Sequence, residues 1–249
     1  MRTLEEINQE IAAHHGCGFE LCAGATNPVP GEGNPQADVM FVGEGPGKNE
    51  DLQGQPFVGA AGKLLDELLA GIGMQRNDVF IGNVIKHRPP NNRDPKPEEI
   101  AHQWPWLRDQ VEAIQPKLIV LLGRHAMDTF LPDCAISQDH GRGKRFRSQV
   151  FYPVYHPAAA LYNGSLRSVL ADDFAKIPGL LQKIGAGEQP DRLPLEPALP
   201  AARAAMKLDE LAHGAHQTNS NKTNQLETAQ DALSNQTNYS NERLLTKGE

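Results

Sequence analysis

The sequence predicts an α/β protein with three layers (an α/β/α sandwich), in which helices cover both faces of a mainly parallel, four-stranded central sheet. Four short apolar runs, at 39–42, 79–85, 118–122 and 151–154, alternate with stretches of helical periodicity. Continuous apolar strands are typical of a sheet that is buried on both faces. Strands that alternate with helices are typical of a three-layer sandwich.

The N-terminal half of the chain is expected to hold two helices, which flank the first strand. The first, 3–15, has Ile7 and Ile11 at helical spacing, and the second, 62–72, carries an apolar face of leucines. Between the first helix and the first strand, residues 16–35 are rich in glycine and proline, which favours a loop.

The second strand is followed by a segment that cannot form regular structure. Residues 87–97 contain four prolines, which remove backbone donors and fix φ. Pro97 suits the first position of a helix that runs to about Ile114. A further helix is expected to start at Gly123, after the third strand, and the last expected helix spans 166–184.

Charge and composition restrict the class of protein. The net charge is −7, and residues 1–185 hold 18 lysines and arginines against 22 aspartates and glutamates. A nucleic-acid partner would therefore need a local basic patch. Three cysteines do not fit a secreted disulfide scaffold. Because no apolar run is long enough to cross a bilayer, we expect a monomeric cytoplasmic protein with no membrane partner.

The composition changes near residue 185, which predicts a folded domain at 1–185 and a different segment at 186–249. The second segment starts with a proline-rich linker and continues in asparagine, glutamine, threonine and serine, with few apolar side chains. Such a tail cannot bury enough apolar surface to offset the entropy of ordering, so we expect it to be disordered.

A glycine-rich stretch, GEGPG at 43–47, follows the first strand. Its spacing matches neither the Walker loop nor the dinucleotide fingerprint. Pro46 lacks an N–H, and the carboxylates of Glu44 and Glu50 would repel a phosphate. Backbone donors and carboxylates at a strand end suit a neutral heterocycle, although a tight turn alone would also require glycine.

Three side chains near strand ends fit a flat heterocyclic ligand. Phe57 offers a ring for stacking on a base, worth about 1–3 kcal/mol per base. Asn83 lies in a strand, where asparagine is disfavoured, and its amide can read one edge of a base. His156 precedes a proline at the end of the fourth strand and can donate to a developing anion. Two of them also have a structural alternative: Phe57 as core, and Asn83 bonded to the neighbouring backbone.

Four stretches in order resemble the family 4 uracil-DNA glycosylases. They are GEGPGKNEDLQGQPFVGAAGKLLDELL, VFIGNVIKHRPPNNRDPKPEEI, QPKLIVLLGRHAM and VYHPAAAL. The resemblance covers about residues 31–175. It implies the uracil-glycosylase fold and an enzyme that hydrolyses the N-glycosidic bond of deoxyuridine in DNA. Release of uracil leaves an abasic site and starts base-excision repair.

The resemblance also implies roles for individual residues. Uracil would stack on Phe57, Asn83 would read its N3–H and O4, and His156 would donate to O2. Glu50 would exclude the methyl group of thymine at C5. Gly45 stands where other glycosylase families hold a water-activating aspartate, so Asn92 becomes a candidate for positioning water. The predicted catalytic residues are His156, Asn83, Glu44 and Asn92, and the predicted substrate-binding residues are Gly43, Gly45, Gly47, Glu50, Phe57, Asn83 and His156.

Family 4 enzymes usually carry a [4Fe–4S] cluster on four cysteines. The aligned positions here are Gly16, Phe19, His87 and Gln103. None is a cysteine, so we expect no cluster, no other cofactor and no metal ligands. Cys17 and Cys22 lie near these positions, and the sequence leaves open whether they bind a metal together with His87. Packing, with Trp104 and Trp106 as candidates, is then expected to hold the N-terminal segment.

The expected partner is uracil-containing DNA, single- or double-stranded. The segment HGRGKRFRSQ, next to the fourth strand, combines four basic residues with an aromatic ring and predicts phosphate contacts, although a solvated hairpin would look the same. Leu161 is a candidate wedge for the base stack. The predicted DNA-binding residues are Lys86, Arg88, Arg93, Arg142, Lys144, Arg145, Arg147 and Leu161.

Two other functions remain open from the sequence. One is a protein that binds or crosslinks uracil-DNA, because related proteins trap the sugar through a histidine in a basic loop after the second strand. The segment KHRPPNNRDPKP shares the start of that loop but has no insertion. The other is a glycosylase of shifted specificity, for example towards hypoxanthine.

Overall fold

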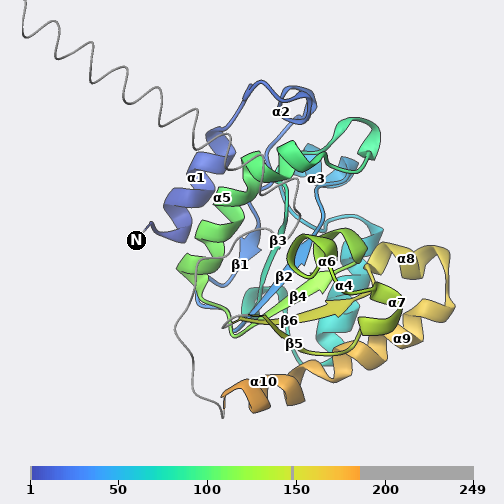
Figure 1. The fold of residues 1–249 in the computed structure, drawn as a ribbon. Coiled ribbons are helices and arrows are strands. Elements are labelled where there is room, and N and C mark those ends of the chain that lie inside the picture. Colours follow the sequence, from blue (N-terminus) through green and yellow to red (C-terminus); the bar gives the residue numbers. More distant parts are fainter. Residues whose placement is uncertain (1, 147–148, 186–249) are drawn as a thin grey trace, which may run out of the picture. The chain divides into compact units, whose positions relative to one another are not determined.

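The computed structural model describes residues 2–146 and 149–185, and in this part of the chain six strands form one sheet (Figure 1). The strand order is β1-β3-β2-β4-β6-β5. The four inner strands are parallel, and the edge strands β1 and β5 are antiparallel to their neighbours. The strands are β1 Glu32–Gly33, β2 Val39–Gly43, β3 Phe80–Asn83, β4 Leu118–Leu122, β5 Lys144–Phe146 and β6 Gln149–Val154.

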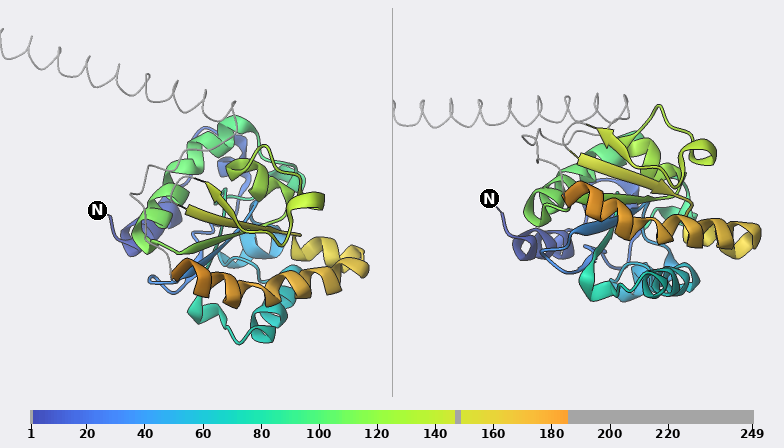
Figure 2. Two further views of the ribbon diagram at one scale, coloured as in Figure 1. Left: turned by 60° about the horizontal axis from the view of Figure 1, so that its bottom comes forward. Right: turned by 90° about the horizontal axis from the view of Figure 1, so that it is seen from below.

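Helices cover both faces of the sheet, which confirms the predicted three-layer α/β fold (Figure 2). On one face α4, α9 and α10 pack leucines and Phe174 against the strands, and on the other α5 and α6 pack Trp104 and Phe130 against Phe151. The helices are α1 Leu4–Ala13, α2 Glu20–Gly24, α3 Lys48–Gln53, α4 Ala60–Gly71, η1 Arg76–Asp78, η2 Pro90–Asn92, α5 Pro97–Ile114, α6 Arg124–Phe130, α7 Ile136–Asp139, α8 Pro157–Tyr162, α9 Ser165–Ala175 and α10 Ile177–Gly185.

The strong periodic elements match the sequence prediction, and the short ones were missed. Helix α5 and strand β4 have the predicted bounds. The two short edge strands make the sheet six-stranded, not four-stranded, because edge pairing needs only two or three residues. The predicted helix 166–184 is divided into α9 and α10, since Pro178 fits only the first turn of a new helix.

Two predictions fall on residues outside the described part of the chain. They are the DNA contact of Arg147 and the disordered tail at 186–249, and both stay predictions. None of the described helices combines the length and the apolar character that crossing a membrane requires.

Helix α1 lies alongside α5 (Figure 1). Trp106 is one of the residues of α5 that contact it. The indole of Trp106 packs against Ile7 and Ile11, and its Nε1 donates to Glu10 Oε1 at 2.8 Å. Trp104, by contrast, is fully buried in the core against Phe130. Packing of the N-terminal segment therefore uses one of the two tryptophans that the sequence suggested.

A strained loop after α3 positions Phe57. Its φ of 53° lies in the left-handed region, which few non-glycine residues adopt. The guanidinium of Arg76 holds the loop by donating to the carbonyl oxygens of Pro56 at 2.6 Å and of Phe57 at 3.2 Å. A Cβ at Gly62 would overlap the carbonyl oxygen of Phe57, so helix α4 approaches the loop as closely as it does only with glycine there.

This close approach predicts a difference between two glycines of the same helix. Gly62→Ala is expected to lower the free energy of unfolding by about 1–3 kcal/mol, because the new methyl group must displace the loop. Gly71→Ala is the matched control, since its Cβ would meet nothing within 4 Å, and alanine is expected to raise the stability by up to about 1 kcal/mol. Urea unfolding of both variants measures this, and equal effects would contradict it.

Candidate active site

A cavity of about 280 Å³ lies at the edge of the sheet where β2, β3 and β6 end. It brings together Phe57, Asn83 and His156, which come from three separate segments. Every residue that the sequence assigns to catalysis or base recognition lines this cavity, apart from Gly43. The lining residues are Glu44, Gly45, Pro46, Gly47, Glu50, Phe57, Ala61, Asn83, Ile85, Pro89, Asn92, Arg93, His156 and Ala158.

Asn83 supplies a buried amide to the cavity. Its side chain is 2% exposed, and within the described residues its Oδ1 accepts no hydrogen bond. An unpaired buried acceptor costs about 1–3 kcal/mol, so a ligand that donates to Oδ1 removes this cost. The structural alternative, in which the Asn83 side chain binds the neighbouring backbone, is therefore not observed for Oδ1 in the described part of the chain.

Gly43 lets the amide of Asn83 and the ring of Phe57 meet. Gly43 pairs with Asn83 in the register of β2 and β3. A Cβ at this position would lie 2.5 Å from Asn83 Oδ1 and 2.8 Å from Phe57 Cζ. Both distances are too short for packed atoms, so the side chains of Phe57 and Asn83 both occupy the space next to the Gly43 backbone.

His156 completes the set from the end of β6. Its imidazole faces the ring of Phe57 with 5.7 Å between the ring centroids and 27° between the planes. His156 is also the N-cap of α8, and its Nδ1 accepts the N–H of Ala158 at 3.1 Å. Because Nδ1 is an acceptor, the neutral ring carries its proton on Nε2 and offers a donor there.

Burial keeps this imidazole neutral. It lowers the pKa of His156 to about 4, with the carboxylate of Glu50 opposing the shift and His125 adding to it. At neutral pH the group that faces the cavity is thus an uncharged N–H donor. Such a donor can stabilise a negative charge that forms on a ligand by hydrogen bonding, and the imidazole keeps its proton.

Glu50 lines the cavity but is held by the protein. Its Oε1 accepts the N–H groups of Val58 and Gly59, each at 3.0 Å, at the start of α4. A carboxylate is favoured at a helix N-terminus, and the two hydrogen bonds hold the Glu50 side chain in one conformation. Glu50 therefore forms a fixed wall of the cavity next to the Phe57 loop.

Glu44 belongs to a small group of ionisable side chains beside the cavity. His125 Nε2 lies 3.9 Å from Glu44 Oε2 and 3.6 Å from Asp94 Oδ2. Burial raises the pKa of Glu44, and Asp94 adds to the rise while His125 and Arg124 oppose it. A carboxylate with a raised pKa is a better proton acceptor than an ordinary glutamate.

The proline-rich loop contributes Asn92 and two arginines. Asn92 is exposed, and its Oδ1 accepts from Arg88 Nε at 2.7 Å. Arg93 forms a bidentate ion pair with the buried Glu99, at 2.7 and 2.8 Å, and a second pair with Glu20. The charge of Arg93 is thus largely compensated within the protein, and Arg88 is the freer of the two cations at this rim.

The prediction of a DNA contact by Lys86 is wrong. Lys86 is fully buried, and its Nζ donates to the carbonyl oxygen of Asn83 at 2.9 Å and to Gln110 Oε1 at 2.7 Å. Burial lowers the pKa of Lys86 to about 7. Because its Nζ is enclosed with these two acceptors, Lys86 supports Asn83 and does not reach a phosphate.

The basic segment lies differently from what its position in the sequence suggested. Strand β5 runs antiparallel to β6, so Arg145 pairs with Val150 at the amino end of β6. Val150 lies four residues, about 13 Å, before Val154, so Arg145 lies toward the end of β6 that is remote from the site. Lys144 pairs with Asp139 at 2.6 Å. Among the described basic residues of this segment, Arg142 is nearest the site edge, next to Gly141, which donates to the Pro153 carbonyl at 2.9 Å.

Leu161 is 46% exposed on α8, the helix that His156 caps, and Tyr162 beside it is 94% exposed. Both side chains are therefore accessible to a partner beside the cavity, which Ala158 of the same helix lines. The placement agrees with the predicted wedge, which stays a prediction.

Several positioning residues were not recognised in the sequence. The sequence did not indicate that Arg76 would hold the Phe57 loop, because an isolated arginine before a strand has many explanations. Gly62 did give a signal, since a glycine within a helical pattern often marks a close approach. His125 directly follows a strand end, where site residues collect in parallel sheets.

The neutral state of His156 predicts how stability depends on pH. The unfolded histidine has a pKa of about 6.5, above its folded value of about 4. Between these values the unfolded chain binds the extra proton, so stability falls as the pH decreases. From pH 7 to pH 5, the native chain should lose about 1–2 kcal/mol more unfolding free energy than His156→Gln. Urea unfolding at both pH values measures this, and equal losses would count against a neutral buried His156.

Comparison with known proteins identifies the family. The sequence model of the uracil DNA glycosylase superfamily matches residues 30–176. A type-4 uracil-DNA glycosylase from Sulfurisphaera tokodaii is 48% identical over 71% of this chain and 84% of its own length. Those from Archaeoglobus fulgidus and Thermotoga maritima are 47% and 41% identical, over 74% and 73% of this chain and 96% of their own lengths. The chain therefore belongs to the type-4 uracil-DNA glycosylases of this superfamily.

Proposed function

We propose that this protein removes uracil from DNA by hydrolysing the N-glycosidic bond of deoxyuridine, which leaves an abasic site for base-excision repair. The observation that carries the proposal is the buried Oδ1 of Asn83, which has no partner among the described residues and faces a cavity shared with Phe57 and His156. Relatives at 41–48% identity are named uracil-DNA glycosylases, which supports the same activity here.

The cavity suits uracil because each edge of the base meets a matching group. Asn83 Oδ1 accepts the N3–H of uracil, and its amide N–H donates to O4. The ring of Phe57 stacks on the face of the base. Glu50, fixed by two backbone N–H groups, stands near C5 and leaves no room for the methyl group of thymine. Extruding the base costs a few kcal/mol, which these contacts offset.

His156 drives bond cleavage by stabilising the departing base. As the bond from N1 to C1′ breaks, the bonding electrons remain with uracil and negative charge grows on O2. The Nε2–H of His156 donates to that oxygen, and one such donor is typically worth about 2.7–4 kcal/mol. Water then adds to C1′, and its proton passes to the group around Glu44 or to solvent, with Asn92 at the rim to orient it.

We further propose that the enzyme is monofunctional and needs no covalent intermediate. Among the described residues that line the cavity there is no lysine to attack C1′. The catalytic domain spans residues 1–185, and the protein acts as a monomer in the cytoplasm on uracil in single- or double-stranded DNA. It works without the family's [4Fe–4S] cluster, because the chain has three cysteines where four are needed.

The direct test is release of free uracil from an oligonucleotide with one deoxyuridine. His156→Ala is expected to lower the single-turnover rate about 10²–10³-fold, because the O2 donor is lost. Asn83→Ala should lower it strongly as well, yet cost little stability, because Asn83 Oδ1 makes no hydrogen bond within the described chain. Chromatography of the base gives the rate, and thermal unfolding serves as the control.

Other outcomes of this assay separate the remaining functions. A DNA–protein adduct that survives detergent would indicate a crosslinking protein. Release of hypoxanthine but not uracil would indicate a shifted specificity. Absence of any free base from all substrates would refute the proposed activity.

Salt dependence of DNA binding tests the cations separately. Each lysine or arginine that contacts a phosphate contributes to the slope of log affinity against log salt concentration. Arg142→Ala is expected to reduce this slope by about 1, whereas Lys86→Met should leave it unchanged because Lys86 is buried. Fluorescence anisotropy with an uncleavable deoxyuridine analogue measures both slopes. A reduced slope for Lys86→Met would contradict the assignment of Lys86 as a structural residue.

A further inference from the structure

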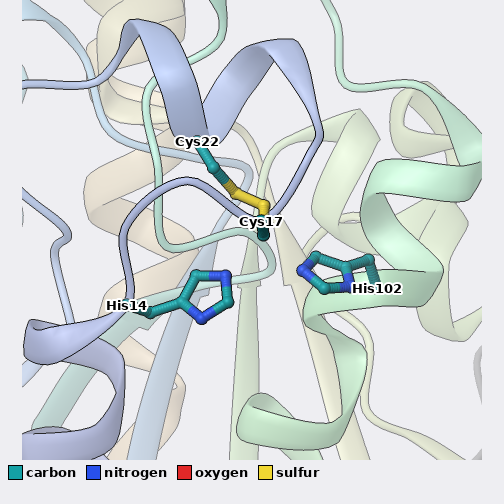
Figure 3. Close-up of side chains that lie close together, drawn as sticks. All are labelled: His14, Cys17, Cys22 and His102. Carbon is teal, nitrogen blue, oxygen red and sulfur yellow. A yellow bond between two sulfur atoms is a disulfide. The ribbon is translucent and has the colours of Figure 1, made fainter.

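Four side chains with metal-binding atoms meet near the N-terminus of the chain, away from the candidate active site. They are His14, Cys17, Cys22 and His102, and their donor atoms all lie within 4.8 Å of one another. Figure 3 shows the two imidazole rings on either side of the sulfur atoms. His14 caps the end of α1, Cys17 lies in the following loop, Cys22 lies in α2 and His102 lies in α5, so the group links residues 14–22 to a helix that is distant in the sequence.

Gln103 and His87 form hydrogen bonds to residues of this group, as neighbouring residues commonly do around metal ligands. Gln103 Nε2 donates to the sulfur of Cys22 at 3.6 Å and to His87 Nδ1 at 2.9 Å. Because Nδ1 of His87 accepts, its Nε2 carries the proton and donates to the carbonyl oxygen of His14 at 3.1 Å. Hydrogen bonds of this kind orient ligands and stabilise a thiolate.

One potential ligand atom of the group, Nε2 of His14, has no hydrogen-bond partner within the described residues. This nitrogen is also buried. A buried imidazole nitrogen without a partner is costly unless it binds something. A metal ion among these four side chains would give it that partner.

The residues do not fit the family's [4Fe–4S] cluster. That cluster requires four thiolates, but the four aligned positions carry no thiol, and only two of the chain's three cysteines belong to the group. His87 and Gln103, at two of the aligned positions, instead serve as hydrogen-bonding supports. Two thiolates and two neutral imidazoles are the ligand set of structural zinc, and the two negative charges balance Zn²⁺.

Cys17 and Cys22 form a disulfide in the structure, which is the oxidised form of this group. A dithiol reductant transfers two electrons and two protons to the disulfide and becomes a disulfide itself, which leaves two thiols. Each thiol then releases its proton to water when zinc binds. Thiol reductants in the cytosol keep most cysteines reduced, so the metal-binding form is the one expected there.

We propose that reduced His14, Cys17, Cys22 and His102 bind one zinc ion, which replaces the iron–sulfur cluster as the link between the N-terminal segment and α5. The site is structural, because all four positions of a tetrahedral ion are filled by protein. Loss of the ion should therefore act first on stability and not on the chemistry of the cavity.

The test is metal analysis of the full chain, purified with a phosphine reductant, exposed to zinc and freed of excess metal. About one zinc per chain is expected, with none in Cys22→Ser or His102→Ala. Cys134→Ser is the matched control, since this cysteine lies outside the group, and it should retain the zinc. Thermal unfolding should occur at a higher temperature with zinc than after chelation in the native chain, and at the same temperature in Cys22→Ser.

Substitution with Co²⁺ provides a second measurement that does not depend on activity. Two thiolates and two imidazoles should give the intense d–d bands of tetrahedral cobalt and a sulfur-to-cobalt charge-transfer band, both absent in Cys22→Ser. The proposal is overturned if the reduced chain, with its thiols verified by titration, binds no zinc. Iron together with acid-labile sulfide would also overturn it.

Discussion

The candidate active site depends on one strained loop, the segment that places Phe57. The residue adopts a left-handed backbone conformation, and three neighbours enforce it: Arg76 binds the carbonyls of the loop, Gly62 leaves room for them, and Glu50 binds the N–H groups that follow. Without this conformation the ring could not face both His156 and the amide of Asn83. Strain at this point is maintained because many surrounding contacts determine it together.

A chain of buried and partly buried hydrogen bonds connects Asn83 to the N-terminal helix. Lys86 binds the backbone carbonyl of Asn83, and Gln110 accepts from the same Nζ. The Nε2 of Gln110 donates to Asn8 Oδ1 and to the carbonyl of Pro30. Each link is fully buried or partly buried, where an unpaired group would be costly. The N-terminal segment therefore contributes to the site although none of its residues lines the cavity.

The candidate site combines an uncharged imidazole, that of His156, with the carboxyl groups of Glu44 and Glu50. His156 is held as an uncharged donor by burial, with its tautomer set by the N–H of Ala158. Glu44, with a raised pKa, is the nearest candidate for a base, and it is a modest one. Catalysis of this kind depends on preorganised dipoles at the leaving group more than on activation of water.

The sequence by itself determined the layer order, the parallel strands and the kinds of group at the strand ends. Periodicity fixed α5 and β4, because long amphipathic and continuous apolar patterns have few alternatives. The convergence of Asn83 and His156 also followed from the sequence, since parallel strands end at one edge, whereas Phe57 reaches the same edge through the loop between α3 and α4.

Only the tertiary structure decided which side chains are free to act. A lysine is expected at the surface, yet Lys86 is buried, and the antiparallel pairing of β5 with β6 places Arg145 toward the end of β6 that is remote from the site. His14 and His102 are 88 positions apart in the sequence, and no local pattern predicts that they meet two cysteines. Such contacts depend on how helices pack side by side, which local spacing does not encode.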